Sequence, residues 1–181
     1  MYHCLSRPRE AEIEAVERIL NFAKLTGVTI YFVHISTLEA IKAIENAKKQ
    51  GINVYAETCP HYLLLDDSCY NGDFFETAKY VLSPPLRKTI DNEALWQAID
   101  NGTIDTIATD HCPFNTFGQK ELGINDFTKI PNGAGGIENR VGLMYPYGVL
   151  QNKLTLNRMV ELCSTNPAKI FGFSSKGKLK V

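Results

Sequence analysis

The sequence predicts an α/β fold with a parallel β-sheet, and three observations support this prediction. Apolar residues alternate along the chain between helical spacing and short continuous runs. The short runs are rich in β-branched and aromatic residues, as in strands that are buried on both faces of a parallel sheet. Strand-like and helix-like segments follow one another through the first two thirds of the chain, which is the order found in βαβ units.

Each predicted element has a local signal of its own. Residues 9–24 carry apolar side chains at helical spacing, and Gly27 follows them as a stop signal. Residues 28–33, with the sequence Val-Thr-Ile-Tyr-Phe-Val, form the first strand-like run. The same reasoning predicts, in chain order, a helix over 38–50, a strand over 52–57, a helix over 92–100, a strand over 104–109, and helices after Glu138 and over 155–163.

Two long stretches interrupt the alternation of strands and helices. Residues 59–87 hold one short apolar piece before Ser83-Pro-Pro, and residues 111–136 contain several glycines without a clear period. Both stretches follow predicted strands. In α/β proteins, long loops that leave the carboxyl ends of strands are the usual location of ligand sites.

Composition excludes several classes of protein. The chain has 181 residues, of which 44% are hydrophobic and 22% charged, so collagen-like, coiled-coil and disordered chains are excluded. A net charge of −1 offers no basic excess for a phosphate backbone, and no apolar run is long enough to span a bilayer. The start of the chain lacks the apolar core of a signal peptide, and the five cysteines show no CxxC spacing. We therefore expect a cytoplasmic protein with reduced thiols that binds neither nucleic acid nor membranes.

Polar side chains of the kind that bind metals follow each predicted strand. His34 comes after the first strand, Cys59-Pro60-His61 after the second, and Asp110-His111 after the third. In a parallel barrel these strand ends meet at one mouth, where residues that are distant in sequence can surround one ion. The pattern leaves a second interpretation open, since a histidine in this place can be structural and an aspartate can cap a helix.

Seven motifs in a fixed order make a resemblance specific. They are Val33-His-Ile-Ser, Glu57-Thr-Cys-Pro-His-Tyr-Leu, Ser83-Pro-Pro-Leu-Arg, Ala108-Thr-Asp-His-Cys-Pro-Phe, Lys129-Ile-Pro-Asn-Gly, Gly136-Ile-Glu and Ser164-Thr-Asn-Pro-Ala-Lys. Over nearly its whole length the chain resembles the dihydropyrimidinase/D-hydantoinase branch of the amidohydrolase superfamily.

This resemblance implies a TIM (β/α)8 barrel with two Zn²⁺ ions at its mouth that hydrolyses cyclic amides such as hydantoins and dihydropyrimidines. By position, His34 matches a metal ligand at the end of the sixth barrel strand. Asp110 matches the catalytic carboxylate after the eighth strand, which binds the other zinc and moves the proton. Ser83 and Asn132 match the substrate-binding residues that hold the ring through their backbones. The ligand set of the family does not include His61 or His111.

The resemblance also implies that parts of the site lie outside this chain. The family takes a His-x-His pair, a carboxylated lysine and a further histidine from earlier strands, and the sequence contains no His-x-His. We expect residues 1–181 to be a single fragment, a partial barrel with about the last three strands and their helices. The N-terminal half of the barrel and the flanking β-rich domain are then absent. Such a chain should be inactive, bind zinc weakly and form homo-oligomers through its open strand edges.

Two alternatives remain open at the level of sequence. Allantoinases and dihydroorotases share the superfamily, although the stretches around Asp110 and Asn132 fit the hydantoinase branch better. A non-catalytic scaffold that resembles the collapsin-response mediators is the alternative from another functional class. Those proteins lack the metal-binding residues that match His34 and Asp110, so the presence of both residues favours an enzyme.

Overall fold

The computed structural model describes residues 2–179 and contains one parallel sheet. Its strands are β1 (Ile30–Phe32), β2 (Val54–Thr58) and β3 (Thr106–Ile107), in the spatial order β1-β2-β3. Ile30 pairs with Val54 at one end of the sheet, and Thr58 pairs with Ile107 at the other. The predicted parallel arrangement is therefore confirmed.

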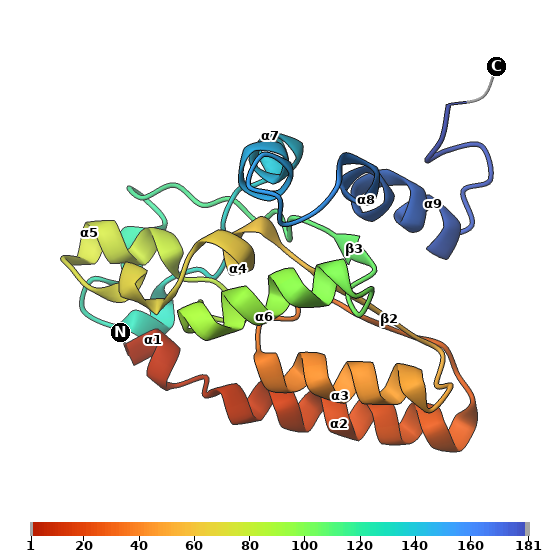
Figure 1. Cartoon of the computed structure of the whole chain (residues 1–181). Helices are drawn as coiled ribbons and strands as arrows, with labels where there is room; N and C mark the ends of the chain where they lie inside the picture. The colour runs from red at the N-terminus through yellow and green to blue at the C-terminus, as the bar shows by residue number, and fades with distance from the viewer. Residues whose placement is uncertain (1, 180–181) are drawn as a thin grey trace.

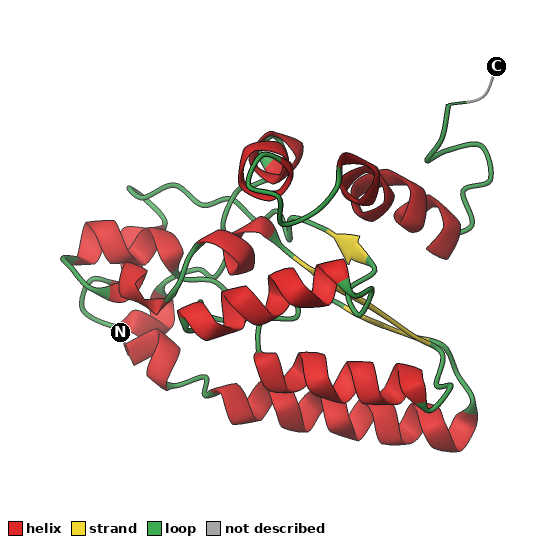
Figure 2. Ribbon diagram, viewed as in Figure 1, coloured by secondary structure: helices red, strands yellow, loops and turns green. Residues whose placement is uncertain are grey.

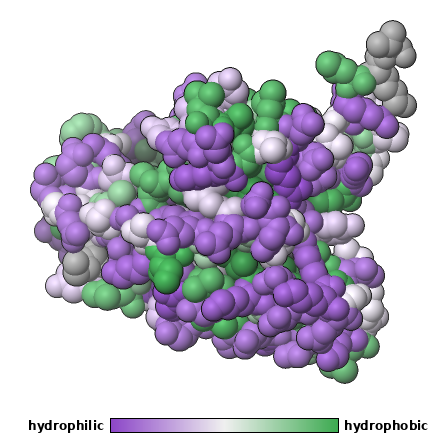
Figure 3. All heavy atoms as spheres, in the orientation of Figure 1, coloured by the Kyte–Doolittle hydropathy of each residue, from purple (hydrophilic) through white to green (hydrophobic). Residues whose placement is uncertain are grey.

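Three helices cover one side of the strands. Helices α2 (Arg9–Thr26) and α3 (Leu38–Lys49) run side by side, and α6 (Thr89–Asp100) packs against α3 (Figures 1 and 2). The outward faces of these helices are mostly hydrophilic, as Figure 3 shows. Their inward faces meet the sheet in a continuous core whose fully buried members include Ile44, Leu95, Ile99, Ile104 and Ile107.

Local signals explain where the long helices begin and end. Helix α2 stops at Gly27, whose φ of 72° closes the last turn with a hydrogen bond from its N–H to the Ala23 carbonyl. Helix α3 begins after Thr37, whose hydroxyl accepts a hydrogen bond from the Ala40 N–H. Both helices agree with the predicted ranges to within two residues.

Shorter helices occupy the remainder of the described chain. The C-terminal part contains α7 (Arg140–Met144), α8 (Leu156–Val160) and α9 (Asn166–Ile170), with π-helical turns η5 (Tyr145–Val149) and η6 (Glu161–Thr165) between them. A short helix, α1 (Tyr2–Leu5), precedes α2, and the segment between β2 and α6 holds α4 (Pro60–Leu64), η1 (Asp67–Tyr70), α5 (Phe74–Thr77) and η2 (Ala78–Tyr80). Two further 3-10 turns, η3 (Lys120–Gly123) and η4 (Phe127–Lys129), follow β3.

The first strand is less buried than its sequence predicts. Its three residues are half-buried, and the flanking Val28 and Val33 are 50% and 48% exposed. The reason is that, within residues 2–179, β1 has a neighbouring strand on one side only. The apolar side chains of this run therefore lie along an open edge.

Two further findings bear on the predicted class of protein. No helix in the described part of the chain is long and apolar enough to cross a membrane. The five cysteines are all free thiols in this structure.

Candidate active site at the strand ends

His34 and Asp110 share an unusual backbone conformation. Their φ angles are 42° and 46°, in the left-handed region that residues other than glycine rarely adopt. Each residue follows a strand of the sheet, β1 or β3, within three positions. A left-handed residue in this place turns the chain sharply as it leaves the strand, at a cost of roughly 1–2 kcal/mol. Strain of this kind is often found at functional sites.

Hydrogen bonds between the segments that follow the strands extend the parallel register past the carboxyl ends of the strands. The Ile35 N–H donates to the Glu57 carbonyl at 2.8 Å, and the Ala108 N–H donates to the Thr58 carbonyl at 3.0 Å. The Thr58 hydroxyl also donates to the Ile35 carbonyl, at 2.8 Å. Parallel pairing therefore continues to Ile35, next to His34, and to Ala108, two positions before Asp110. His34 and Asp110 thus lie at the same edge of the sheet.

His61 lies between the two strand ends. It belongs to α4, which follows the middle strand β2. Burial lowers the pKa of His61 to about 4, with the carboxylate of Asp110 acting to raise this pKa and His34 acting to lower it. The three side chains thus share one electrostatic environment. The His61 Nε2 atom is buried and has no hydrogen-bond partner among the described residues.

The two predicted substrate-binding residues lie side by side although 49 positions separate them. The Ser83 hydroxyl donates a hydrogen bond of 3.0 Å to Oδ1 of Asn132. One position further along, the Gly133 N–H donates to the Val81 carbonyl at 3.0 Å. These bonds join the loop before α6 to the loop after β3.

The backbone conformation and the close packing at position 133 require a glycine. Its φ is 148°, and a Cβ atom built there would lie 2.4 Å from the Cys112 carbonyl oxygen. The backbone around Asn132 therefore passes very close to the segment that follows Asp110. His111 supports the same region, because its Nδ1 accepts hydrogen bonds from the N–H groups of Gly136 and Ile137 at 3.1 and 3.3 Å.

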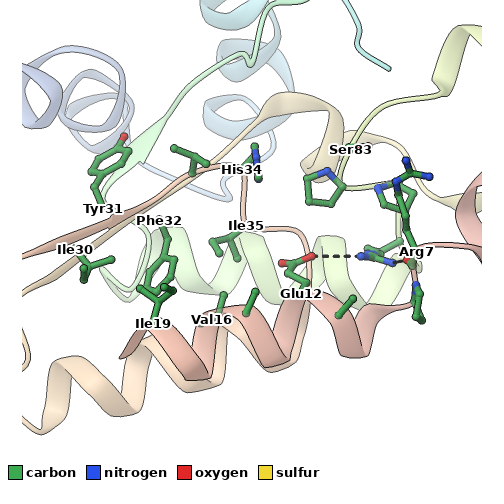
Figure 4. A pocket seen from close by; sticks show the side chains of 17 residues that line it. Arg7, Glu12, Val16, Ile19, Ile30, Tyr31, Phe32, His34, Ile35 and Ser83 are labelled. Atoms are coloured by element: carbon green, nitrogen blue, oxygen red, sulfur yellow. Dashed lines mark hydrogen bonds and ion pairs between the residues drawn. The ribbon is translucent and has the colours of Figure 1, made fainter. Parts of the chain in front are cut away.

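His34 and Ser83 also line one pocket of about 560 Å³. Strand β1 forms one wall and helix α2 the other, as Figure 4 shows. Most of the lining is apolar, with Val16, Ile19 and Phe32 among its members. The pocket thus extends from the strand ends along the open edge of β1.

The donor atoms at the strand ends fit a divalent metal in type but are few in number. An imidazole and a carboxylate, as His34 and Asp110 carry, are ordinary zinc ligands. Within residues 2–179 there is no group of three or more His, Cys, Asp or Glu side chains arranged to hold a metal ion. The described chain therefore offers part of a ligand set.

Sequence reasoning missed one polar residue beside this site. The Lys120 ammonium donates hydrogen bonds to the carbonyls of Val81, Pro131 and Gly133 in the two loops that carry Ser83 and Asn132. Its local sequence, Gly-Gln-Lys-Glu-Leu, is typical of an exposed loop and contains no signal for burial.

Polar residues at the carboxyl edge of a parallel α/β sheet stand where proteins of this fold class bind their ligands. Residues 9–181 match the model of the amidohydrolase family, and the chain belongs to that family. It is 47% identical to the D-hydantoinase of Geobacillus stearothermophilus, over 100% of this chain and 39% of that protein. It is 43% identical to the D-hydantoinase of Ralstonia pickettii, over 100% of this chain and 40% of that protein.

Solved structures agree with this assignment. The chain matches a dihydropyrimidinase from Brevibacillus agri with a TM-score of 0.97 and 48% identity, over 99% of this chain and 39% of that one. It matches an L-hydantoinase from Arthrobacter aurescens with a TM-score of 0.86 and 34% identity, over 96% of this chain and 38% of that one. The chain thus spans about two fifths of the length of the relatives it matches, and its sheet corresponds to part of their TIM barrel.

Proposed function

We propose that this chain contributes the sixth to eighth strands of the barrel in a metal-dependent cyclic amidase. Three observations support the proposal: His34 and Ser83 line one pocket, the Ser83 and Asn132 side chains are hydrogen-bonded, and Gly133 lies against Cys112, two positions after Asp110. Similarity to hydantoinases along the whole chain supports the same reaction class. The proposed substrates are small cyclic amides and ureides, such as hydantoins and dihydropyrimidines.

In this proposal, His34 and Asp110 each supply one ligand to a two-zinc centre. When bound, the metal lowers the pKa of bound water and polarises the ring carbonyl. The remaining ligands come from parts of the full-length protein outside this chain. His61 is not assigned as a ligand, and its neutral imidazole fills the space between the two strand ends.

Asp110 is the proposed catalytic residue. Its carboxylate takes a proton from the attacking water and delivers it to the ring nitrogen as the C–N bond breaks. An amide nitrogen leaves readily only when protonated, so one group that serves both steps removes the main obstacle. The exposure of Asp110 at the strand end leaves its carboxylate accessible to a substrate.

Ser83 and Asn132 are the proposed substrate-binding residues, and they act through their peptide groups. A flat ring with alternating N–H and C=O groups needs donors and acceptors fixed at a set spacing. The hydrogen bond between the two side chains occupies the Ser83 hydroxyl, so in this proposal the backbone groups are the ones that bind the ring.

A substrate panel tests this proposal on the full-length protein loaded with zinc. Hydantoin, dihydrouracil, allantoin and dihydroorotate are each supplied and ring opening is followed. Turnover of hydantoin or dihydrouracil is the expected result. Preferential turnover of allantoin or dihydroorotate would instead indicate an allantoinase or a dihydroorotase. Inactivity on all four substrates in a protein with a full zinc content would favour the non-catalytic scaffold.

A further inference from the structure

Lys120 is buried, and it has no carboxylate partner among residues 2–179. The residue opens η3 and is only 3% exposed, which is unusual for a lysine. Its Nζ donates three hydrogen bonds, to the carbonyls of Val81 at 2.9 Å, Gly133 at 2.9 Å and Pro131 at 3.1 Å. An ammonium group has three donors, so all of them are used. Burial lowers the pKa of Lys120 to about 8, which leaves the group charged at neutral pH.

The three carbonyls belong to the two loops that carry the proposed substrate-binding residues. Val81 lies two positions before Ser83, in what we call the Ser83 loop (residues 80–87). Pro131 and Gly133 flank Asn132 in the Asn132 loop (residues 130–136). Lys120 thus holds the neighbours of both residues and makes no hydrogen bond to the peptide groups of Ser83 or Asn132 themselves.

A third segment lies against the same ammonium. The ring centre of Phe114 is 5.7 Å from Nζ, within the range of a cation–π interaction. Phe114 lies four positions after Asp110, on the segment that leaves β3. The Lys120 N–H also donates to the Asn115 carbonyl at 3.0 Å. One charged group therefore contacts all three loops that line the proposed site.

We propose that Lys120 is a positioning residue that fixes the spacing between the Ser83 and Asn132 loops, and thereby the recognition of the substrate ring. Bonds from an ammonium to carbonyl oxygens are stronger than neutral ones. Loss of the ammonium would leave the Pro131 and Gly133 carbonyls without this donor, whereas the Val81 carbonyl would keep its bond from the Gly133 N–H. The inference rests on the proposed function, because the spacing matters only if the two loops bind a ring.

The test compares Lys120→Met with the matched control Lys129→Met in the full-length, zinc-loaded protein. Methionine fills nearly the same volume without donors. The Lys129 side chain, by contrast, is 69% exposed and forms an ion pair with Asp126. For Lys120→Met we expect KM for hydantoin to rise by about tenfold or more, with a smaller change in kcat and an unchanged zinc content. Lys129→Met should keep both constants.

Hydrogen exchange provides a readout that does not depend on activity. In Lys120→Met, backbone amides of both the Ser83 loop and the Asn132 loop should exchange faster, while those of α3 should not. Lys120→Gln, which retains donors, serves as the milder variant if methionine prevents folding, and should show the same changes to a smaller degree.

The outcomes separate this inference from the proposed function. Unchanged exchange in both loops overturns the positioning role whatever the activity. Faster exchange with an unchanged KM overturns it as well, because the spacing would then not control recognition. A wild-type protein that opens no cyclic amide contradicts the proposed function, and it also contradicts a role of Lys120 in substrate recognition. The exchange data still decide whether Lys120 holds the two loops together.

Discussion

At the scale of single residues, the site is defined by backbone strain and by burial of polar groups. His34 and Asp110 adopt left-handed conformations after the outer strands β1 and β3. His61, which follows the middle strand β2, has a buried Nε2 without a hydrogen-bond partner in the described part of the chain. A neutral imidazole is the form that such surroundings stabilise, because burial penalises the charged form. His61 should therefore make the protein sensitive to acid.

This sensitivity can be measured with His61→Gln. The pKa of His61 is about 4 in the folded state, against an ordinary value of 6.5. As pH falls from 6.5 to 4, the unfolded chain binds a proton that the folded chain excludes, so stability decreases with acidification. Between pH 7 and pH 5 the wild type should lose on the order of 2 kcal/mol more unfolding free energy than the variant. Equal losses, measured by urea unfolding of the metal-free proteins, would contradict this account.

At the scale of elements, one buried carboxylate joins three helices. Asp91 of α6 accepts hydrogen bonds from Arg9 at the start of α2 (2.7 Å), from the Leu38 N–H at the start of α3 (2.9 Å), and from the Lys88 N–H at its own N-terminus (3.1 Å). Its side chain is 1% exposed. Asp91 thus links the starts of all three helices on this side of the sheet.

Replacement of Asp91 should lower the free energy of unfolding substantially. Asp91→Ala leaves Arg9 with its remaining partner Glu39 and leaves two backbone N–H groups without an acceptor. We expect a loss of about 3 kcal/mol in unfolding free energy. Asp100→Ala, at the exposed end of the same helix, is the matched control and should change stability by less than about 0.5 kcal/mol. Similar values for the two variants in denaturant unfolding would show that the Asp91 network is dispensable.

Elements with local signals could be predicted, and elements held by distant contacts could not. Helices α2 and α3 follow from apolar periodicity and from the glycines after them. The short helices between β2 and α6 have capping residues such as Asp66 and Asp73 but are too short for apolar periodicity. Distant bonds, such as that from the Tyr62 hydroxyl to the Pro84 carbonyl (2.7 Å), help to hold them. The same contrast applies to the site, where His34 and Asp110 follow from their places after strands. Lys120 does not, because its three acceptors lie 11 to 39 positions away.

At the scale of the whole molecule, the described chain has open edges. Within residues 2–179, β1 and β3 each pair with β2 only, and Val28 and Val33 are exposed beside β1. Open edges carry unpaired N–H and C=O groups, which can form hydrogen bonds with a strand of another chain. We therefore propose that the 181-residue chain on its own associates with further copies.

Light scattering on the purified chain tests this association. The expected result is a dimer or a larger species, with partial dissociation in Val28→Lys, since a lysine next to an edge strand opposes pairing. A wild-type chain that remains monomeric at concentrations of tens of micromolar would contradict the prediction.

We propose that the residues at the strand ends form part of a catalytic site for cyclic amides, and the decisive variant is Asp110→Asn in the full-length protein. Asparagine keeps the size and the exposed position of the side chain but can neither accept the proton nor bind the metal as a carboxylate. With Asp100→Asn as the control, we predict that kcat for hydantoin falls by several orders of magnitude while the circular dichroism spectrum is retained. Turnover close to that of the wild type in Asp110→Asn would contradict the account.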